Sequence, residues 1–167
     1  SDWNSTLIDA IRTTPAKSNP GNSTRSMAMM NATIYDVFQA IDRTHTPFLV
    51  NVSAPGASLE AAVAQAAYRT LADSYGEQQA MLDKVLADRL AVIPDSQAKT
   101  AGIALGNRVA MQYINTRSSD GSNQPDAYTP TKLPGHWSPD PLHPSQTAWG
   151  QAWGGVTPWA INNPDQF

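Results

Sequence analysis

Residues 59–75, LEAAVAQAAYRTLADSY, decide the fold class of this chain. Alanine is the best helix former, and its small side chain lets neighbouring helices approach closely. Ser58 precedes the stretch as a suitable N-cap, and Glu60 places an anion in the first turn, where the helix dipole favours it. Gly76 follows as a glycine that ends a helix should. The stretch therefore predicts a central helix that is packed on several sides.

Helical periodicity continues on both sides of this stretch. Apolar residues at spacings of three and four predict further helices over residues 3–11, 24–43, 77–93 and 96–117. We interpret residues 17–24, which contain Pro20 and Gly21, as a polar loop, and Asp95 as the cap of the last helix. With no strand signal of consequence, the predicted fold class is all-α: a helical bundle half of about five helices.

Two details of packing follow from this pattern. Met27 and Met30 begin an apolar stripe that continues through Phe38, and we interpret the methionines as core filler. Gly102 and Gly106 lie four residues apart inside the last helix. Each glycine costs a helix about 1 kcal/mol relative to alanine, so we expect a close crossing by another helix as compensation.

The periodicity stops at about residue 118. Residues 1–117 form the predicted helical scaffold half, and residues 118–167 form an irregular Trp/Pro-rich tail or strap. The tail holds eight of the 13 prolines and four of the five tryptophans, namely Trp137, Trp149, Trp153 and Trp159. Disordered segments are poor in aromatic residues, and each tryptophan favours burial of a large area. We therefore expect the tail to pack on a partner or on a missing C-terminal half.

The composition excludes several function classes. Of 167 residues, 41% are hydrophobic and only 15% are charged, below the quarter that is usual in soluble domains. The low charge suggests that part of the surface is covered in the working protein. A net charge of −3 with scattered basic residues argues against nucleic acid, and no apolar stretch predicts a membrane span. The absence of cysteine excludes disulfides and thiol chemistry.

The N-terminus and the glycosylation sequons bear on localisation. Ser1 and Asp2 open the chain without an initiator Met, which is typical of a processed N-terminus and favours an exported protein, periplasmic or extracellular. Sequons for N-glycosylation, which permit the modification in a eukaryotic secretory protein without showing it, begin at Asn4, Asn22, Asn31 and Asn51.

Few residues could carry chemistry. His136 and His143 flank Asp140 in the tail and are weak candidates for a metal site, but their spacing matches no established ligand pattern, so we favour loop histidines. Residues 120–123, DGSN, resemble the start of a calcium loop but lack its later ligands, so we favour a helix-terminating turn. With no nucleophile elbow, P-loop or dinucleotide fingerprint, we assign no catalytic, cofactor-binding or metal residue.

Several phrases together resemble a known family. They are RSMAMMNATIYD at 25–36, ASLEAAVAQAA at 57–67, AGIALG at 101–106, RSSDG at 117–121, PGHW at 134–137 and WGGVTP at 153–158. In this order and spacing they resemble the N-terminal half of bacterial vanadium-dependent haloperoxidases. That family is related to type 2 phosphatidic acid phosphatases and bacterial acid phosphatases. The likeness runs from Trp3 to Phe167.

The resemblance implies an almost all-helical fold whose core binds vanadate or phosphate. The family's anion-binding residues lie in its C-terminal half, in three motifs: Lys followed after six residues by Arg-Pro, then Pro-Ser-Gly-His, then Arg followed by His. None is present here: no proline follows Arg25 after Lys17, and residues 134–136 lack the serine. We therefore expect a non-catalytic scaffold portion, completed by a second polypeptide that carries the catalytic half.

Two other hypotheses stay open. The chain is either that scaffold or a non-enzymatic extracellular structural module that reuses the fold and self-assembles as a homo-oligomer. An independent metal hydrolase that uses His136 and His143 ranks far behind both. The choice between peroxidase and phosphatase depends on residues around the anion, which this chain does not contain.

Overall fold

The computed structural model describes residues 3–125, 127–131, 133–163 and 165–166. Ser1 and Asp2, which bear on the expectation of an exported protein, lie outside these residues. The described residues contain no strand, which confirms the all-α class. These residues form five α-helices: α1 (Trp3–Arg12), α2 (Pro20–Asp42), α3 (Leu59–Ser74), α4 (Gln79–Ala91) and α5 (Gln97–Arg117). Short 3-10 helices are η1 (Pro15–Lys17), η2 (Gly76–Gln78) and η3 (Gln151–Gly155).

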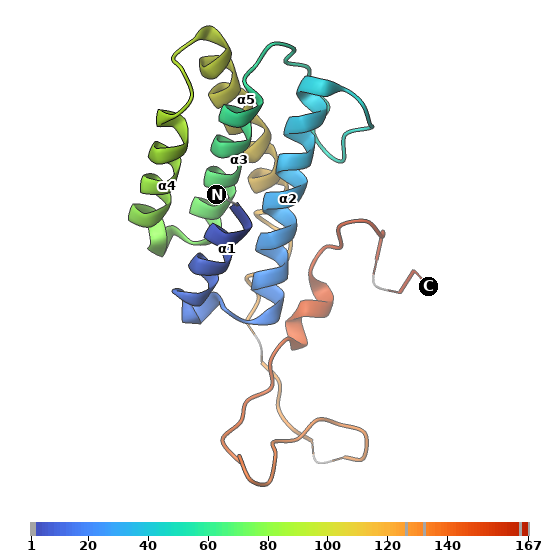
Figure 1. The fold of residues 1–167 in the computed structure, drawn as a ribbon. Helices are drawn as coiled ribbons and strands as arrows, with labels where there is room; N and C mark the ends of the chain where they lie inside the picture. Colours follow the sequence, from blue (N-terminus) through green and yellow to red (C-terminus); the bar gives the residue numbers. More distant parts are fainter. Residues whose placement is uncertain (1–2, 126, 132, 164, 167) are drawn as a thin grey trace. The chain divides into compact units, whose positions relative to one another are not determined.

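The chain divides into two compact units, Ser1–Ser118 and Ser119–Phe167, called here the helical unit and the C-terminal unit. All five α-helices belong to the helical unit (Figure 1). In the described part of the C-terminal unit, η3 is the one helical element, and the remainder consists of turns and irregular chain. None of the described helices is both long enough and apolar enough to cross a membrane.

Helix α3 is central to the helical unit, as predicted. It contacts α1, α2, α4 and α5, and Figure 1 shows it between α2 and α4 with α5 behind. Ala61, Ala62, Ala66 and Ala67 are completely buried. The Ser58 hydroxyl accepts a hydrogen bond from the backbone N–H of Ala61 (3.2 Å), which confirms the N-cap. Alanine on every side lets four neighbours approach one helix.

The two glycines of α5 make the closest of these approaches. A Cβ atom on Gly102 or Gly106 would collide with a backbone carbonyl oxygen of the α3 segment, that of Ser58 or Ala62. On Gly106 it would also lie 2.8 Å from the Cβ atom of Gln65. The backbone N–H of Ser58 donates to the carbonyl of Ala98 (2.8 Å), tying the start of α3 to the first turn of α5. The predicted close helix crossing is confirmed.

A hydrophobic core fills the space around the other side of α3. Trp3 and Leu7 of α1 are buried against it, and Leu71, Tyr75 and Leu82 complete the cluster from α3, its C-cap and α4. The short leading helix predicted over residues 3–11 is therefore a packed element of the core. The indole ring of Trp3 buries one of the largest apolar areas that a side chain can offer.

Two helix starts differ from the prediction. Residues 20–24 are not a loop, because α2 begins at Pro20 and Asn19 is its N-cap, with the side-chain oxygen accepting from the N–H of Asn22 (2.8 Å). Proline suits the first helical position, where no N–H partner is needed. The cap of α5 is Ser96 and not Asp95; the Asp95 carboxylate instead pairs with the Lys99 ammonium (2.8 Å).

Two further expectations are corrected. Helix α3 ends directly before Gly76, as predicted, but Gly76 does not adopt the left-handed conformation of a glycine cap and instead begins η2. Met27 and Phe38 are not core residues, since 44% and 38% of their surfaces remain exposed. Met29 is completely buried instead. Met30 and Val37 of the predicted stripe are completely buried, so the core-facing side of α2 agrees with the prediction except at Met27 and Phe38.

The glycine contact yields a stability prediction. Gly106→Ala should lower the free energy of unfolding by about 2 kcal/mol, because overpacking against a rigid carbonyl exceeds the gain of about 1 kcal/mol in helix propensity. Gly76→Ala is the matched control, since nothing lies within 4 Å of a Cβ atom there. Urea denaturation measures both. An unchanged or raised stability of Gly106→Ala would contradict the close packing.

Candidate functional site

The most strongly organised polar group of the helical unit is the carboxylate of Asp36, on α2. It is completely buried. One oxygen accepts from the backbone N–H of Phe48 (2.6 Å), and the other accepts from the N–H groups of Leu49 (2.9 Å) and Val50 (2.7 Å). The Tyr113 hydroxyl of α5 donates to the second oxygen (2.8 Å). Four donors thus satisfy an anion that would otherwise be costly to bury.

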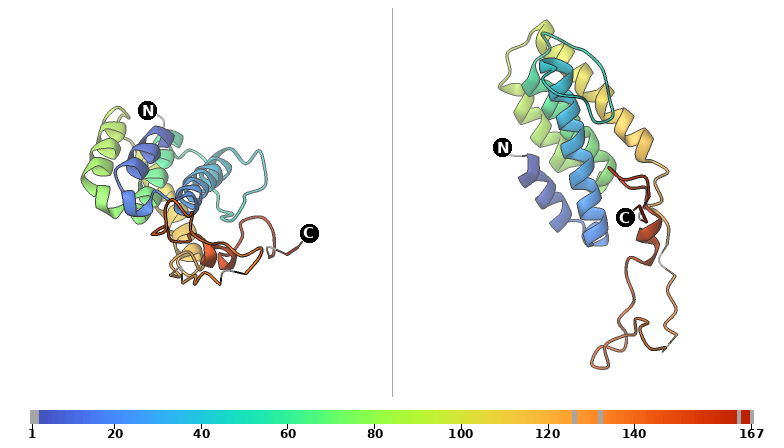
Figure 2. Two further views of the ribbon diagram at one scale, coloured as in Figure 1. Left: turned by 90° about the horizontal axis from the view of Figure 1, so that it is seen from below. Right: turned by 90° about the vertical axis from the view of Figure 1, so that its right-hand side faces the viewer.

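These bonds fix the connection between α2 and α3. Arg43 ends α2 in the left-handed conformation (φ 51°) and donates its N–H to the carbonyl of Gln39 (3.1 Å). The Gln39 side chain accepts from the N–H of His45 (2.7 Å), and the N–H of Ala54 bonds to the carbonyl of Ala40 (2.8 Å). Figure 2 shows the connection doubled back beside α2. Its position is therefore set by hydrogen bonds along most of its length.

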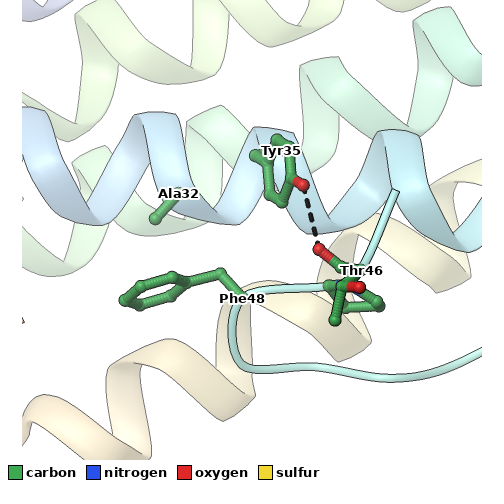
Figure 3. Close-up of a pocket in the computed structure, with 5 residues that line it drawn as sticks. Ala32, Tyr35, Thr46 and Phe48 are labelled. Carbon is green, nitrogen blue, oxygen red and sulfur yellow. Dashed lines mark hydrogen bonds between the residues drawn. The ribbon is translucent and has the colours of Figure 1, made fainter. Parts of the chain in front are cut away.

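A pocket of about 420 Å³ opens between α2 and this connection. Ala32 and Tyr35 of α2 line one side, and Thr46, Pro47 and Phe48 line the other (Figure 3). The Tyr35 hydroxyl donates to the carbonyl of Thr46 (2.9 Å) across it. Among the residues that the structure describes, no charged side chain lines the pocket, so its chemistry suits an apolar side chain and not an anion.

Large apolar side chains surround this pocket. We use the name apolar face for the exposed residues of α2 and the connection, namely Met27 (44% exposed), Tyr35 (38%), Phe38 (38%) and Leu49 (43%), with Phe48 of the pocket (48%). The three α2 residues share one side of the helix, at spacings of eight and three. Several exposed large apolar side chains on one side of a helix and its adjoining connection are typical of a site of protein interaction.

The sequence reasoning did not identify this site. It placed Phe38 in the core and assigned no role to Asp36 beyond its place in a family phrase. The partners of Asp36 lie 12 to 14 residues later and at residue 113, so no local spacing connects them. A usable signal was the apolar run Phe48, Leu49 and Val50, which is unusual directly after Pro47 in a connection.

Burial alters the chemistry of Tyr113. Loss of solvent, together with its hydrogen bond to the Asp36 carboxylate, raises the pKa of Tyr113 far above its ordinary value of about 10. The phenol therefore stays a neutral donor under any physiological condition. Its geometry suits support of the Asp36 carboxylate and not proton transfer to a ligand.

The weak metal candidates lie in turns of the C-terminal unit. His136, His143 and Asp140 are all exposed. The Asp140 side chain accepts from the N–H of Leu142 (2.9 Å), and its carbonyl accepts from the N–H of His143 (2.8 Å). Within the part of the chain that the structure describes, no three His, Asp or Glu side chains come together as a metal site would require.

The segment after α5 forms the predicted turn. The Asp120 side chain accepts from the N–H of Ser122 (3.1 Å), and Gly121 adopts a left-handed conformation (φ 91°). The carbonyl of Asp120 accepts from the N–H of Thr157 (2.8 Å), which closes the C-terminal unit on itself. The Asp120 carboxylate thus holds its own backbone, as aspartate does in turns.

The tail tryptophans are partly exposed. Trp137 is 37% exposed and packs edge-on to Tyr128, with ring centroids 5.7 Å apart. Trp149 is 48% exposed, and its ring centroid lies 5.8 Å from that of Trp153. Packing of these rings on a partner stays a prediction.

Comparison of the chain with protein-family models, with curated proteins and with solved structures finds no match.

The Asp36 site yields a first prediction. Asp36→Asn should lower the free energy of unfolding by about 3 kcal/mol, because the amide replaces an acceptor with a donor that faces buried N–H groups. Asp42→Asn, exposed at the end of the same helix, should change it by less than about 0.5 kcal/mol. Urea denaturation tests both. Equal effects of the two substitutions would show that the buried carboxylate does not organise the connection.

The raised pKa of Tyr113 yields a second prediction. The folded state keeps the phenol proton at a pH where the unfolded chain loses it, so this stabilisation is complete below about pH 10 and is lost above it. In that range the stability of the native protein should fall more steeply than that of Tyr113→Phe, by up to about 1.4 kcal/mol per pH unit. Urea denaturation at several pH values measures the difference. Parallel curves above pH 10 would contradict the assignment.

Proposed function

We propose that this chain is the non-catalytic N-terminal scaffold portion of an enzyme similar to vanadium haloperoxidases or acid phosphatases. Its oxyanion site, for vanadate or phosphate, would lie on helices outside these residues. The observation that carries the proposal is the apolar face, where well-positioned apolar side chains remain exposed on α2 and the α2–α3 connection. Additional helices would find there a surface of the kind that helix bundles bury.

The family phrases support the proposal through their structural roles. The first phrase is joined to the fourth, because the Arg25 guanidinium donates to the carbonyl of Arg117 (2.8 Å). The first also ends in Asp36, which organises the connection. The second phrase, residues 57–67, packs on the two glycines of the third. These residues build a frame, as a scaffold portion requires.

The distribution of charge agrees with a site elsewhere. Binding of a multiply charged oxyanion needs converging Arg and Lys side chains, backbone N–H donors and a histidine as ligand or nucleophile. Lysines of the helical unit serve local pairing instead. Lys17 pairs with Glu77 (3.3 Å), and Lys84 pairs with Asp88 (2.6 Å). The proposal therefore assigns the anion-binding cations to the other helices.

Native purification followed by mass spectrometry tests the proposal. We expect the chain to be accompanied by a polypeptide, or by a continuation of itself, that carries the three anion-binding motifs. The associated material should show haloperoxidase activity with vanadate or hydrolyse a phosphate ester. Recovery of the chain without such sequence would overturn the proposal. Light scattering that shows a homo-oligomer would favour the self-assembling module instead.

Substitution on the apolar face tests where the other helices pack. Phe38→Glu should abolish association with them, because it places a charge in a surface that the assembly desolvates. Ile8→Glu is the matched control: Ile8 is also helical and is 40% exposed, on α1. Co-purification of tagged variants measures the difference. Equal retention by the two variants would show that the apolar face is not the site of association.

A further inference from the structure

A second pocket, of about 500 Å³, lies in the helical unit and is lined by residues of α1, α3, α4 and the segment after α4. Its apolar lining includes Trp3 of α1, Val63 and Ala64 of α3, and Ile93 after α4. The indole of Trp3 is only 7% exposed, so it forms part of a fixed wall. Pockets for small molecules measure about 300–1,000 Å³ and combine such an apolar lining with a few polar groups.

Two opposite charges complete this pocket. Glu60 comes from the first turn of α3, and Arg89 comes from the last turn of α4. Helices α3 and α4 are joined by η2 and lie side by side, which brings the start of one to the end of the other (Figure 1). One acidic and one basic residue therefore line the same largely apolar pocket, with Glu60 exposed to solvent and Arg89 half-buried.

The two charges do not neutralise each other. Glu60 accepts one hydrogen bond, from the Ser58 hydroxyl (3.3 Å), and among the described residues it forms no ion pair. Arg89 has no hydrogen bond or ion pair within the described part of the chain, although it is half-buried. Its fork of N–H donors matches the geometry of a carboxylate, which could bind with two parallel hydrogen bonds.

We propose that this pocket binds a free α-amino acid with an apolar side chain. The ligand carboxylate pairs with Arg89, its ammonium pairs with Glu60, and its side chain packs on Trp3, Val63 and Ile93. A ligand with both charges makes one more charged contact than a ligand with a single charge, at the half-buried Arg89 or at the exposed Glu60, and therefore binds more tightly. The inference is independent of the proposed function, because the pocket and the apolar face share no residue.

A matched ligand series tests the proposal by titration calorimetry on the full chain. L-phenylalanine carries both charges, 3-phenylpropanoate carries the carboxylate alone, and phenethylamine carries the ammonium alone. L-phenylalanine should bind about tenfold more tightly than phenethylamine, which lacks the contact with the half-buried Arg89. It should bind up to about fivefold more tightly than 3-phenylpropanoate, which lacks the contact with the exposed Glu60. Lack of binding by L-phenylalanine, or equal affinity for all three, would overturn the proposal.

Substitutions of the two charged residues should separate their roles. Arg89→Gln should weaken L-phenylalanine and 3-phenylpropanoate by about tenfold and leave phenethylamine unchanged. Glu60→Gln should weaken L-phenylalanine and phenethylamine and leave 3-phenylpropanoate unchanged. If the two charges served only to stabilise the helix ends, both substitutions would cause small changes in stability. They would not then change the three ligand affinities in this pattern.

The exposed Arg108 of α5 provides the control, since Arg108→Gln should leave all three affinities unchanged. The site is located by the amide and indole resonances of Trp3, which should shift on addition of L-phenylalanine. Equal losses for Arg108→Gln and Arg89→Gln, or shifts confined to other residues, would also overturn the proposal.

Discussion

The contact between α3 and α5 is the constraint on which the helical unit depends. Gly102 and Gly106 allow the backbone of α5 to approach that of α3 until no room remains for a Cβ atom. The glycines weaken α5 as an isolated helix, by about 1 kcal/mol each. The close approach offsets this cost through dense contact along both backbones. It also fixes α3 in place, so that α1, α2 and α4 pack around a helix whose position is already determined.

The buried Asp36 carboxylate is the second important interaction, because it positions the α2–α3 connection against the helices. It gathers three successive N–H groups of the α2–α3 connection and the Tyr113 hydroxyl of α5. The connection thereby becomes one wall of the pocket beside Tyr35. Removal of one of these donors would leave the buried charge less well compensated in a site that water does not reach. The Asp36 side chain therefore both positions the connection and contributes to the stability of the fold.

Much of this fold was predictable from sequence, because helix periodicity and alanine content are local signals. Gly102 and Gly106 even indicated that another helix crosses their own helix closely. The errors arose where two local rules competed: Pro20 suggested a loop but suits a helix start once Asn19 caps it. Met27 and Met29 were indistinguishable by apolar character, and tertiary packing chose between them. The Asp36 site was not predictable, since its donors are distant in sequence and most belong to the backbone.

The hydrogen bonds to Asp36 have one more consequence. They hold the connection by main-chain N–H groups, which every residue except proline supplies. The exposed side chains of Phe48 and Leu49 therefore take no part in holding the loop to Asp36. These two side chains can therefore be substituted without loss of the hydrogen bonds that hold the connection. In Phe48 and Leu49 the main-chain atoms stabilise the fold, while the side-chain atoms determine the chemistry of the exposed surface.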